Sequence, residues 1–238
     1  LSFFVLVSVK KWIPLILYAF SCLSKPWRKA VFLDLFLHEI HQGLLNKYLP
    51  NFSTIFLNAG AHIQHHYFFN SSVLKTKRLN NPSWYINEKE DPLLDLLKIY
   101  DQIIGDYLSR ENYELILATG LSQKPYDKVK FYYRLTRHEE FLNNIGISYE
   151  KVLPRMTRDF LISFYNQDSA LKAEKKLKNI YVNNDLRLFG EIDNRGKELF
   201  VTLTFPNEIT GETFVNINEK TLKLDDQVTF VAIKNGMH

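Results

Sequence analysis

The sequence predicts an α/β fold, a three-layer α/β/α sandwich with a mostly parallel sheet and a small α+β lobe. Two short apolar segments, 54–57 and 115–118, each follow a helical pattern and each end in a polar turn. Repeated helix, strand and polar turn in this order are typical of a parallel sheet covered by helices. Residues 158–205 then show the order strand, helix, strand, strand, which predicts the lobe.

The composition is that of an ordinary globular chain. Its 238 residues suffice for one large domain or two small ones, with 46% hydrophobic and 24% charged residues. Aromatic residues make up 14%, which predicts an aromatic-rich core. The net charge of +4 is modest and no block of lysine and arginine resembles a binding arm, so we expect no nucleic-acid partner. Cys22 is the single cysteine, which excludes an internal disulfide and leaves the compartment open, with the cytoplasm preferred.

Both ends of the chain suggest a larger protein. The first residue is Leu1 rather than methionine, and the last three residues form a Gly-Met-His turn. We therefore expect residues 1–238 to be one α/β domain that is part of a longer chain.

The apolar segment 3–23 is interrupted by Lys10, Lys11 and Pro14. Its longest uncharged part, 12–23, is too short to span a bilayer. We predict a buried or interface helix here, and a segment lying on a membrane surface is the alternative. No firm membrane span is expected, and the oligomeric state stays open.

Residues 29–48 show the strongest helical pattern, because apolar side chains recur there at steps of three and four residues. Pro50 ends this helix and leads into the strand predicted at 54–57. His38 and His41 lie three residues apart on the helix, and such a pair can share a metal ion. The surrounding pattern favours an ordinary amphipathic helix.

A second helix is predicted to begin at Pro92, with Asp91 as its N-cap. The strand 115–118 follows this helix and ends in the polar turn 119–123. If the two predicted strands are parallel neighbours in one sheet, this turn and residues 58–62 lie at the same sheet edge. We therefore expect one shared site at that edge.

The second half of the chain predicts a mixture of helices and strands. A helix at 135–144 is expected to end before Gly146, and Asp168 or Ser169 is expected to cap a solvated helix at 170–178. The tripeptide Asn194-Arg195-Gly196 is typical of a hairpin turn. Strands are predicted at 159–165, 186–193, 198–205 and 227–234.

The chemistry is expected in the stretch 52–70, where His62, His65 and His66 follow the first predicted strand. Ligands at the carboxyl end of a strand are how open α/β sheets build sites, and Gly60 permits a tight turn. The alternative is that these histidines belong to an aromatic core with the aromatic residues that follow them. Two further polar clusters follow predicted strands: Thr119 with Ser122 and Gln123, and Gly236 with His238.

These clusters resemble the alkaline-phosphatase superfamily, in particular its type I phosphodiesterase/nucleotide pyrophosphatase branch. That branch carries Asp-x-x-Gly-His after a strand, where this chain has Asn58-Ala59-Gly60-Ala61-His62. It also carries a Ser-Asp-His-Gly turn, where 118–121 occupies the similar place, and a late Gly-x-His turn, matched by residues 236–238. The order of elements agrees as well. The resemblance covers most of the chain, but only the later part of a full family domain.

The resemblance implies a metal-dependent hydrolase of phosphate esters or phosphodiesters, acting on a small phosphorylated or glycan-linked substrate with a divalent metal such as zinc. The family's nucleophile and first metal-binding aspartate lie upstream of this chain. The resemblance implies three metal ligands, which are His62, His238 and Asn58. Secondary candidates are His65, His66 and Thr119.

Three positions depart from the family pattern. Asn58 stands where the family has an aspartate ligand, and a neutral amide is a poorer ligand for a hard dication. Thr119 and Gly120 stand where the family has adjacent Asp and His ligands. The alternative function is therefore a catalytically degenerate member of the same fold that acts as a binding or glycan-assembly partner. A purely structural α/β domain with an aromatic and histidine core is the third hypothesis.

Overall fold

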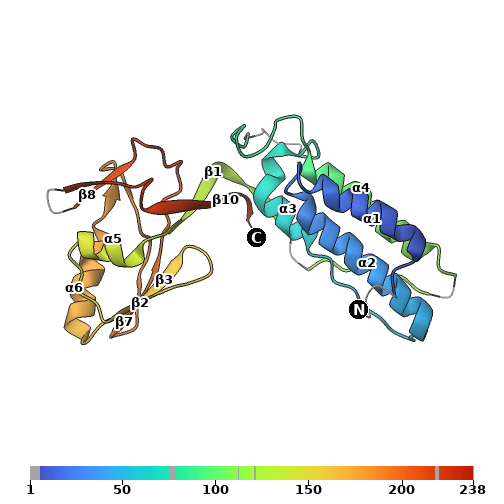
Figure 1. Ribbon diagram of the computed structural model, residues 1–238, viewed down its shortest axis with the longest axis horizontal. Helices are drawn as coiled ribbons and strands as arrows, with labels where there is room; N and C mark the ends of the chain where they lie inside the picture. Colours follow the sequence, from blue (N-terminus) through green and yellow to red (C-terminus); the bar gives the residue numbers. More distant parts are fainter. Residues whose placement is uncertain (1–5, 75–78, 112, 121, 218–219, 238) are drawn as a thin grey trace. The chain divides into compact units, whose positions relative to one another are not determined.

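The computed structural model describes residues 6–74, 79–111, 113–120, 122–217 and 220–237, and the chain divides into two compact units (Figure 1). Unit 1 comprises residues 1–128 and 235–238, and unit 2 comprises residues 129–234. The lobe expected at 158–205 lies within unit 2. Each unit is described below by itself.

Unit 1 is built from helices, which are α1 (Val9–Ser21), α2 (Arg28–Tyr48), α3 (Ala59–Tyr67), the short 3-10 helix η2 (Phe68–Asn70) and α4 (Pro92–Leu108). The two long helices predicted from the sequence are confirmed. α2 ends where Leu49 adopts a left-handed conformation before Pro50. α4 begins with Pro92, and the Asp91 side chain accepts a 2.9 Å hydrogen bond from the Leu94 amide, as expected of an N-cap.

α2 and α4 lie side by side and run in the same direction. Hydrogen-bonded residues of the two helices are separated in the chain by a nearly constant 66 to 68 residues. The pairs are Arg28 with Asp95, Asp34 with Tyr100, and His38 with Asp106. Polar contacts thus determine the register of this helix pair.

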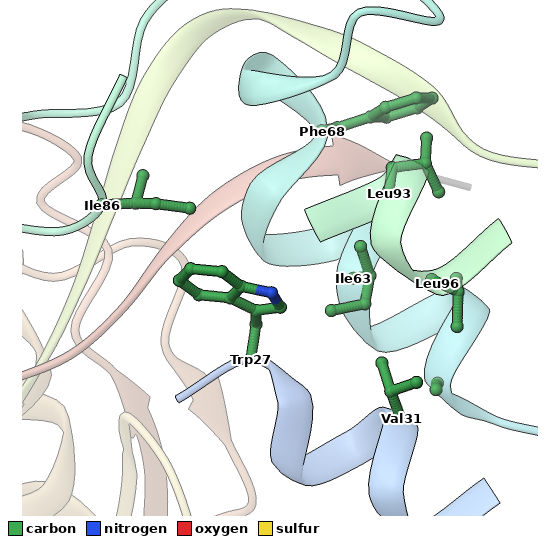
Figure 2. Packing of buried hydrophobic residues seen from close by; sticks show 8 residues of the cluster. Trp27, Val31, Ile63, Phe68, Ile86, Leu93 and Leu96 are labelled. Carbon is green, nitrogen blue, oxygen red and sulfur yellow. The ribbon is translucent and has the colours of Figure 1, made fainter. Parts of the chain in front are cut away.

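An apolar cluster packs α3 against α2 and α4 (Figure 2). Ile63 of α3 is fully buried there and lies among side chains from the beginnings of α2 and α4. Burying a side chain of this size stabilises the fold by about 1.5–3 kcal/mol. The buried members are Trp27, Val31, Ala59, Ile63, Phe68, Ile86, Leu93 and Leu96.

α1 leaves an apolar face in solvent. Ile13, Leu17 and Phe20 are 69%, 64% and 65% exposed, whereas Leu15 is 3% exposed and packs against Leu35 of α2. Residues three and four apart share one side of a helix, so these three side chains form one exposed stripe. In the described part of the chain no helix combines the length and the apolar character needed to cross a bilayer.

The predicted fold class is wrong. Segments 54–57 and 115–118 have no regular secondary structure, and Phe56 and Ile116 are 79% and 77% exposed. The sheets among the described residues are antiparallel, so no parallel sandwich forms. The physical reason is that an apolar segment becomes a strand only when a neighbouring strand takes its main-chain hydrogen bonds. Neither segment has such a neighbour in the described residues.

Unit 2 is mostly strands, with two short helices, α5 (His138–Asn144) and α6 (Gln167–Lys178). One four-stranded sheet has the order β2-β3-β7-β6 and the other β5-β4-β8-β9, while β1 pairs with β10. The strands are β1 (Lys124–Leu135), β2 (Lys151–Pro154), β3 (Asp159–Ser163), β4 (Tyr181–Val182), β5 (Leu186–Arg187), β6 (Asp193–Asn194), β7 (Glu198–Thr202), β8 (Phe214–Ile217), β9 (Lys220–Lys223) and β10 (Val228–Met237).

Several elements of unit 2 were predicted from the sequence. α5 is followed by Gly146 with a positive φ, and β6 and β7 form the hairpin expected around Gly196, whose φ is 86°. The N-cap of α6 is Asn166, not Asp168 or Ser169, because its side chain accepts a hydrogen bond from the Ser169 amide. The long strand β1 was not predicted.

The core of unit 2 is aromatic. Phe160 and Phe189 are fully buried and meet with their ring centroids 5.9 Å apart, and Phe141 of α5 meets Phe189 at 5.8 Å. Such edge-to-face pairs add about 0.5–1.5 kcal/mol beyond the burial of their surface.

Candidate functional site

The start of α3 is held by a buried carboxylate. Asp34 of α2 accepts hydrogen bonds from the Asn58 and Ala59 amides at 3.1 and 2.8 Å, and from the Tyr100 hydroxyl at 2.7 Å. The Tyr100 oxygen in turn accepts from the Gly60 amide at 3.0 Å. A negative charge at a helix N-terminus is favourable, because the first amide groups of a helix have no partner within it. α2 and α4 therefore position α3 and its histidines.

Burial keeps the Tyr100 hydroxyl in its neutral form. The pKa of Tyr100 is raised well above its usual value, first by burial and then by the hydrogen bond to Asp34. The phenol is therefore neutral at physiological pH and remains a donor to the carboxylate.

The three histidines lie on neighbouring turns of α3. The ring centroids of His62 and His66 are 4.8 Å apart, and those of His65 and His66 are 6.5 Å apart. His62 is exposed and the other two are partly buried. Imidazoles four residues apart on one helix face can bind the same metal ion. The alternative of an aromatic core is met only in part. The ring centroid of His66 lies 6.3 Å from that of Tyr67, but His62 is exposed.

The end of β10 reaches α3. The His65 Nδ1 atom lies 3.1 Å from the Gly236 carbonyl oxygen, and the Gln123 side chain donates to the Ala61 carbonyl at 3.2 Å. A Cβ atom on Gly236 would lie 2.7 Å from both Gln123 Oε1 and the Gln64 carbonyl oxygen. Glycine is thus required for this close approach.

The structure brings together part of the predicted site. His62, His65 and His66 share α3 with the end of β10 beside them. Asn58 takes part through its main chain, since its carbonyl accepts from the His62 amide at 3.3 Å. Thr119 is exposed in the irregular segment before β1. His238 lies outside the described residues, so its predicted role stays a prediction.

A second group of possible metal ligands lies between α1, α2 and α4. His38 and Glu39, both buried, and Asp106 place one ligand atom each within 4.8 Å of one another. The Lys11 ammonium lies 3.1 Å from Glu39 Oε1 and 3.6 Å from Asp106 Oδ2, and His38 Nε2 lies 3.0 Å from Asp106 Oδ2. A lysine cation thus neutralises the carboxylates where a metal would do so.

The opposite charges in this cluster stabilise one another. Burial opposes the charged form of Lys11, but the hydrogen bond to Glu39 and the charges of Glu39 and Asp106 raise its pKa overall. An ammonium so stabilised competes with any metal ion. We interpret the cluster as an ion network that holds three helices together. Sequence reasoning noticed His38 but missed its partners, because residues 11 and 106 are distant in the chain.

The sequence favoured an ordinary amphipathic helix over a metal pair of His38 and His41, and both ring nitrogens of His41 lie beside other groups. His41 Nδ1 lies 2.7 Å from the Tyr107 hydroxyl and its Nε2 lies 2.6 Å from Ser53 Oγ. Burial, followed by the charges of His38 and Arg110, lowers the pKa of His41. His41 therefore links α2, α4 and the extended segment after α2.

The α3 histidines fit a metal ion in part. Catalytic zinc sites usually take three protein ligands, and His62 and His66 could supply two of them. Among the described residues no carboxylate joins these two imidazoles in a ligand cluster. No family model, curated protein or solved structure matches the chain. The site is therefore judged on its geometry.

Proposed function

We propose that this chain contributes a divalent-metal site to a hydrolase of phosphate esters, with His62 and His66 as metal ligands. The 4.8 Å separation of their rings on one face of α3 carries the proposal. The reaction class rests on the likeness of residues 58–62 to the Asp-x-x-Gly-His motif in sequence, since no strand precedes them in the structure. The substrate class is a small phosphorylated or glycan-linked molecule.

The metal, when bound, supplies the positive charge that stabilises developing negative charge on a phosphoryl group. The residues of the chain bind the metal ion and orient the helix that carries its ligands. Asp34 fixes the first turn of α3, and the Gly236 carbonyl beside His65 Nδ1 favours the ring orientation in which that nitrogen carries a proton.

The alternative is a catalytically degenerate relative that acts as a binding or glycan-assembly partner. Its specific support is the placement of the carboxylates. In the described part of the chain, the cluster that combines histidine with carboxylates is His38, Glu39 and Asp106, and Lys11 already neutralises it. The α3 histidines lack such carboxylates, which a two-metal hydrolase requires.

The test measures metal binding and turnover separately. The complete protein that contains this chain is titrated with Zn²⁺ and with Co²⁺, whose visible absorption reports nitrogen ligands, and is assayed with bis(p-nitrophenyl) phosphate. We expect His62→Asn and His66→Asn each to weaken Co²⁺ binding by about tenfold or more, a loss of about 1.4 kcal/mol. His138→Asn in unit 2 is the matched control and should leave Co²⁺ binding unchanged.

The outcomes separate the two functions. Metal binding through α3 together with turnover supports the hydrolase. Metal binding without turnover supports the degenerate relative. A chain that binds neither ion overturns the proposed metal site, and equal losses in all three variants would mean that the histidines bind metal nonspecifically.

A further inference from the structure

An apolar row runs along the solvent side of α1. Its members are one helical turn apart and 49–69% exposed, and they are Ile13, Ile16, Leu17 and Phe20. A surface helix of a globular protein normally presents polar side chains to solvent and apolar ones to the core. α1 is apolar on both sides, because Leu15 is buried against α2 beneath this row. Contiguous apolar surface of this kind is typical of a binding surface.

α2 adds a second exposed apolar row. Leu33 and Leu37 are 63% and 41% exposed and lie four residues apart, on the same side of the helix. The rings of Trp12 and Phe36 connect the two helices, with their centroids 6.3 Å apart. Trp12 lies one turn from Ile16, and Phe36 lies one turn from Leu33, so this contact joins the two rows. We call the joined rows the α1–α2 face, made of Ile13, Ile16, Leu17, Phe20, Leu33 and Leu37.

The cations of these helices border the face, and their carboxylates are hidden. α1 contains no acidic residue, and the two acidic residues of α2, Asp34 and Glu39, are only 5% and 6% exposed. Lys10 and Lys29 are both exposed and enter no ion pair in the described part of the chain.

The positions of the two lysines place positive charge at the edge of the apolar surface. Lys10 precedes Ile13 by three residues, and Lys29 precedes Leu33 by four, so each cation lies one turn from a member of the face. The surface that complements the α1–α2 face is therefore apolar in its interior and anionic where it meets the lysines.

A membrane with anionic lipids has this combination of properties. Its acyl chains accept apolar side chains, and its phosphate groups attract lysines at the boundary. A second copy of this chain complements the face less well. In a two-fold symmetric contact the same surface meets itself, and that surface offers Lys10 and Lys29 no exposed carboxylate from α1 or α2.

We propose that the α1–α2 face binds the surface of a membrane that contains anionic phospholipids. α1 lies in the plane of the interface, with its apolar row at the boundary between headgroups and acyl chains. Lys10 and Lys29 lie at the level of the lipid phosphates. This surface is separate from the histidines of α3, and the proposal does not depend on the metal site.

The experiment is co-sedimentation of the complete protein that contains this chain with lipid vesicles. One set of vesicles is phosphatidylcholine alone, and the other also contains phosphatidylglycerol. We expect tighter binding to the anionic vesicles, and weaker binding as salt screens the lysines. Leu17→Ser and Phe20→Ser should each weaken binding by about tenfold, because each removes apolar surface from the contact.

The lysines are tested by the difference between the two kinds of vesicle. Lys10→Gln and Lys29→Gln should each weaken binding to anionic vesicles by about fivefold and leave binding to neutral vesicles unchanged. Met156→Ser and Lys175→Gln in unit 2 are the matched controls, since Met156 is 92% exposed and Lys175 is exposed as well. Both controls should keep the binding of the unchanged protein. Thermal unfolding of each variant confirms that it is folded.

Three results would overturn the proposal. The first is a protein that stays in the supernatant with both kinds of vesicle, including one that gel filtration shows to be a dimer dissociated by Leu17→Ser. The second is a loss of binding in the unit 2 controls as large as that in the α1 variants. The third is equal binding to neutral and anionic vesicles, which excludes a role of the lysines.

Discussion

Asn81 and Asn235, 154 residues apart in the chain, exchange two amide hydrogen bonds of 2.8 Å in the interior of unit 1. Asn235 is fully buried, and its side-chain oxygen also accepts from the Phe69 amide at 3.1 Å. One side chain therefore ties the end of β10 both to η2 and to the segment before α4.

Asn235→Leu should strongly destabilise unit 1. The substitution leaves the Asn81 amide and the Phe69 N–H buried without these partners, and each such group costs about 1–3 kcal/mol. We expect a loss of about 3 kcal/mol in the free energy of unfolding, measured with urea. In the double variant Asn81→Leu, Asn235→Leu the loss should be less than the sum of the single losses. Additive losses would contradict the paired arrangement.

Two helical glycines should respond in opposite directions to alanine. A Cβ atom on Gly43 of α2 would lie 2.0 Å from the Leu6 carbonyl oxygen, whereas a Cβ atom on Gly105 of α4 meets nothing within 4 Å. Alanine favours a helix over glycine by about 1 kcal/mol. Gly105→Ala should therefore stabilise the protein by up to about that amount, while Gly43→Ala should destabilise it.

Urea unfolding of both alanine variants checks this. A stabilising effect of Gly43→Ala would show that residue 6 does not pack against α2.

The hydroxyl of Tyr107 should make stability depend on alkaline pH. Burial raises the pKa of Tyr107 to about 12, although the charge of Arg110 opposes the shift. The unfolded phenol ionises near pH 10. Its contribution to stability is therefore complete below about pH 10 and is lost as the pH rises toward about 12.

Tyr107→Phe removes this titration. The difference in unfolding free energy between the two proteins should shrink between pH 9 and pH 11.5, since Tyr18 and Tyr100 titrate equally in both. A difference that stays constant over this range would show that Tyr107 has an ordinary pKa.

The exposed stripe of α1 should bind hydrophobic dye. Ile13→Ser and Phe20→Ser place polar side chains at positions that are 69% and 65% exposed, so they should lower the fluorescence of bound anilinonaphthalene sulfonate with little loss of stability. Leu15→Ser, at a position 3% exposed, should instead cost about 2–5 kcal/mol, the range for truncating a buried leucine. Dye binding that is unchanged in both surface variants would place the dye elsewhere.

The candidate site shows how far local patterns reach. The sequence singled out His62, His65, His66 and Gly236, but it placed the histidines after a strand and a tight turn, whereas they lie on the helix α3. Nothing in the sequence indicated that Asp34 holds the first turn of α3, or that Lys11 closes the cluster of His38, Glu39 and Asp106. These partners come from different helices, and no local pattern records which helices pack together.

The sequence by itself determined the elements whose signals are local. Asp91 and Pro92 start α4, Gly196 turns the β6–β7 hairpin, and the period of three and four residues forms α2, because caps, turns and periodicity act over a few residues. Only the tertiary structure decided the fate of segments 54–57 and 115–118. A strand exists only when a distant segment accepts its main-chain hydrogen bonds, and that partner is chosen by packing rather than by the residues of the segment.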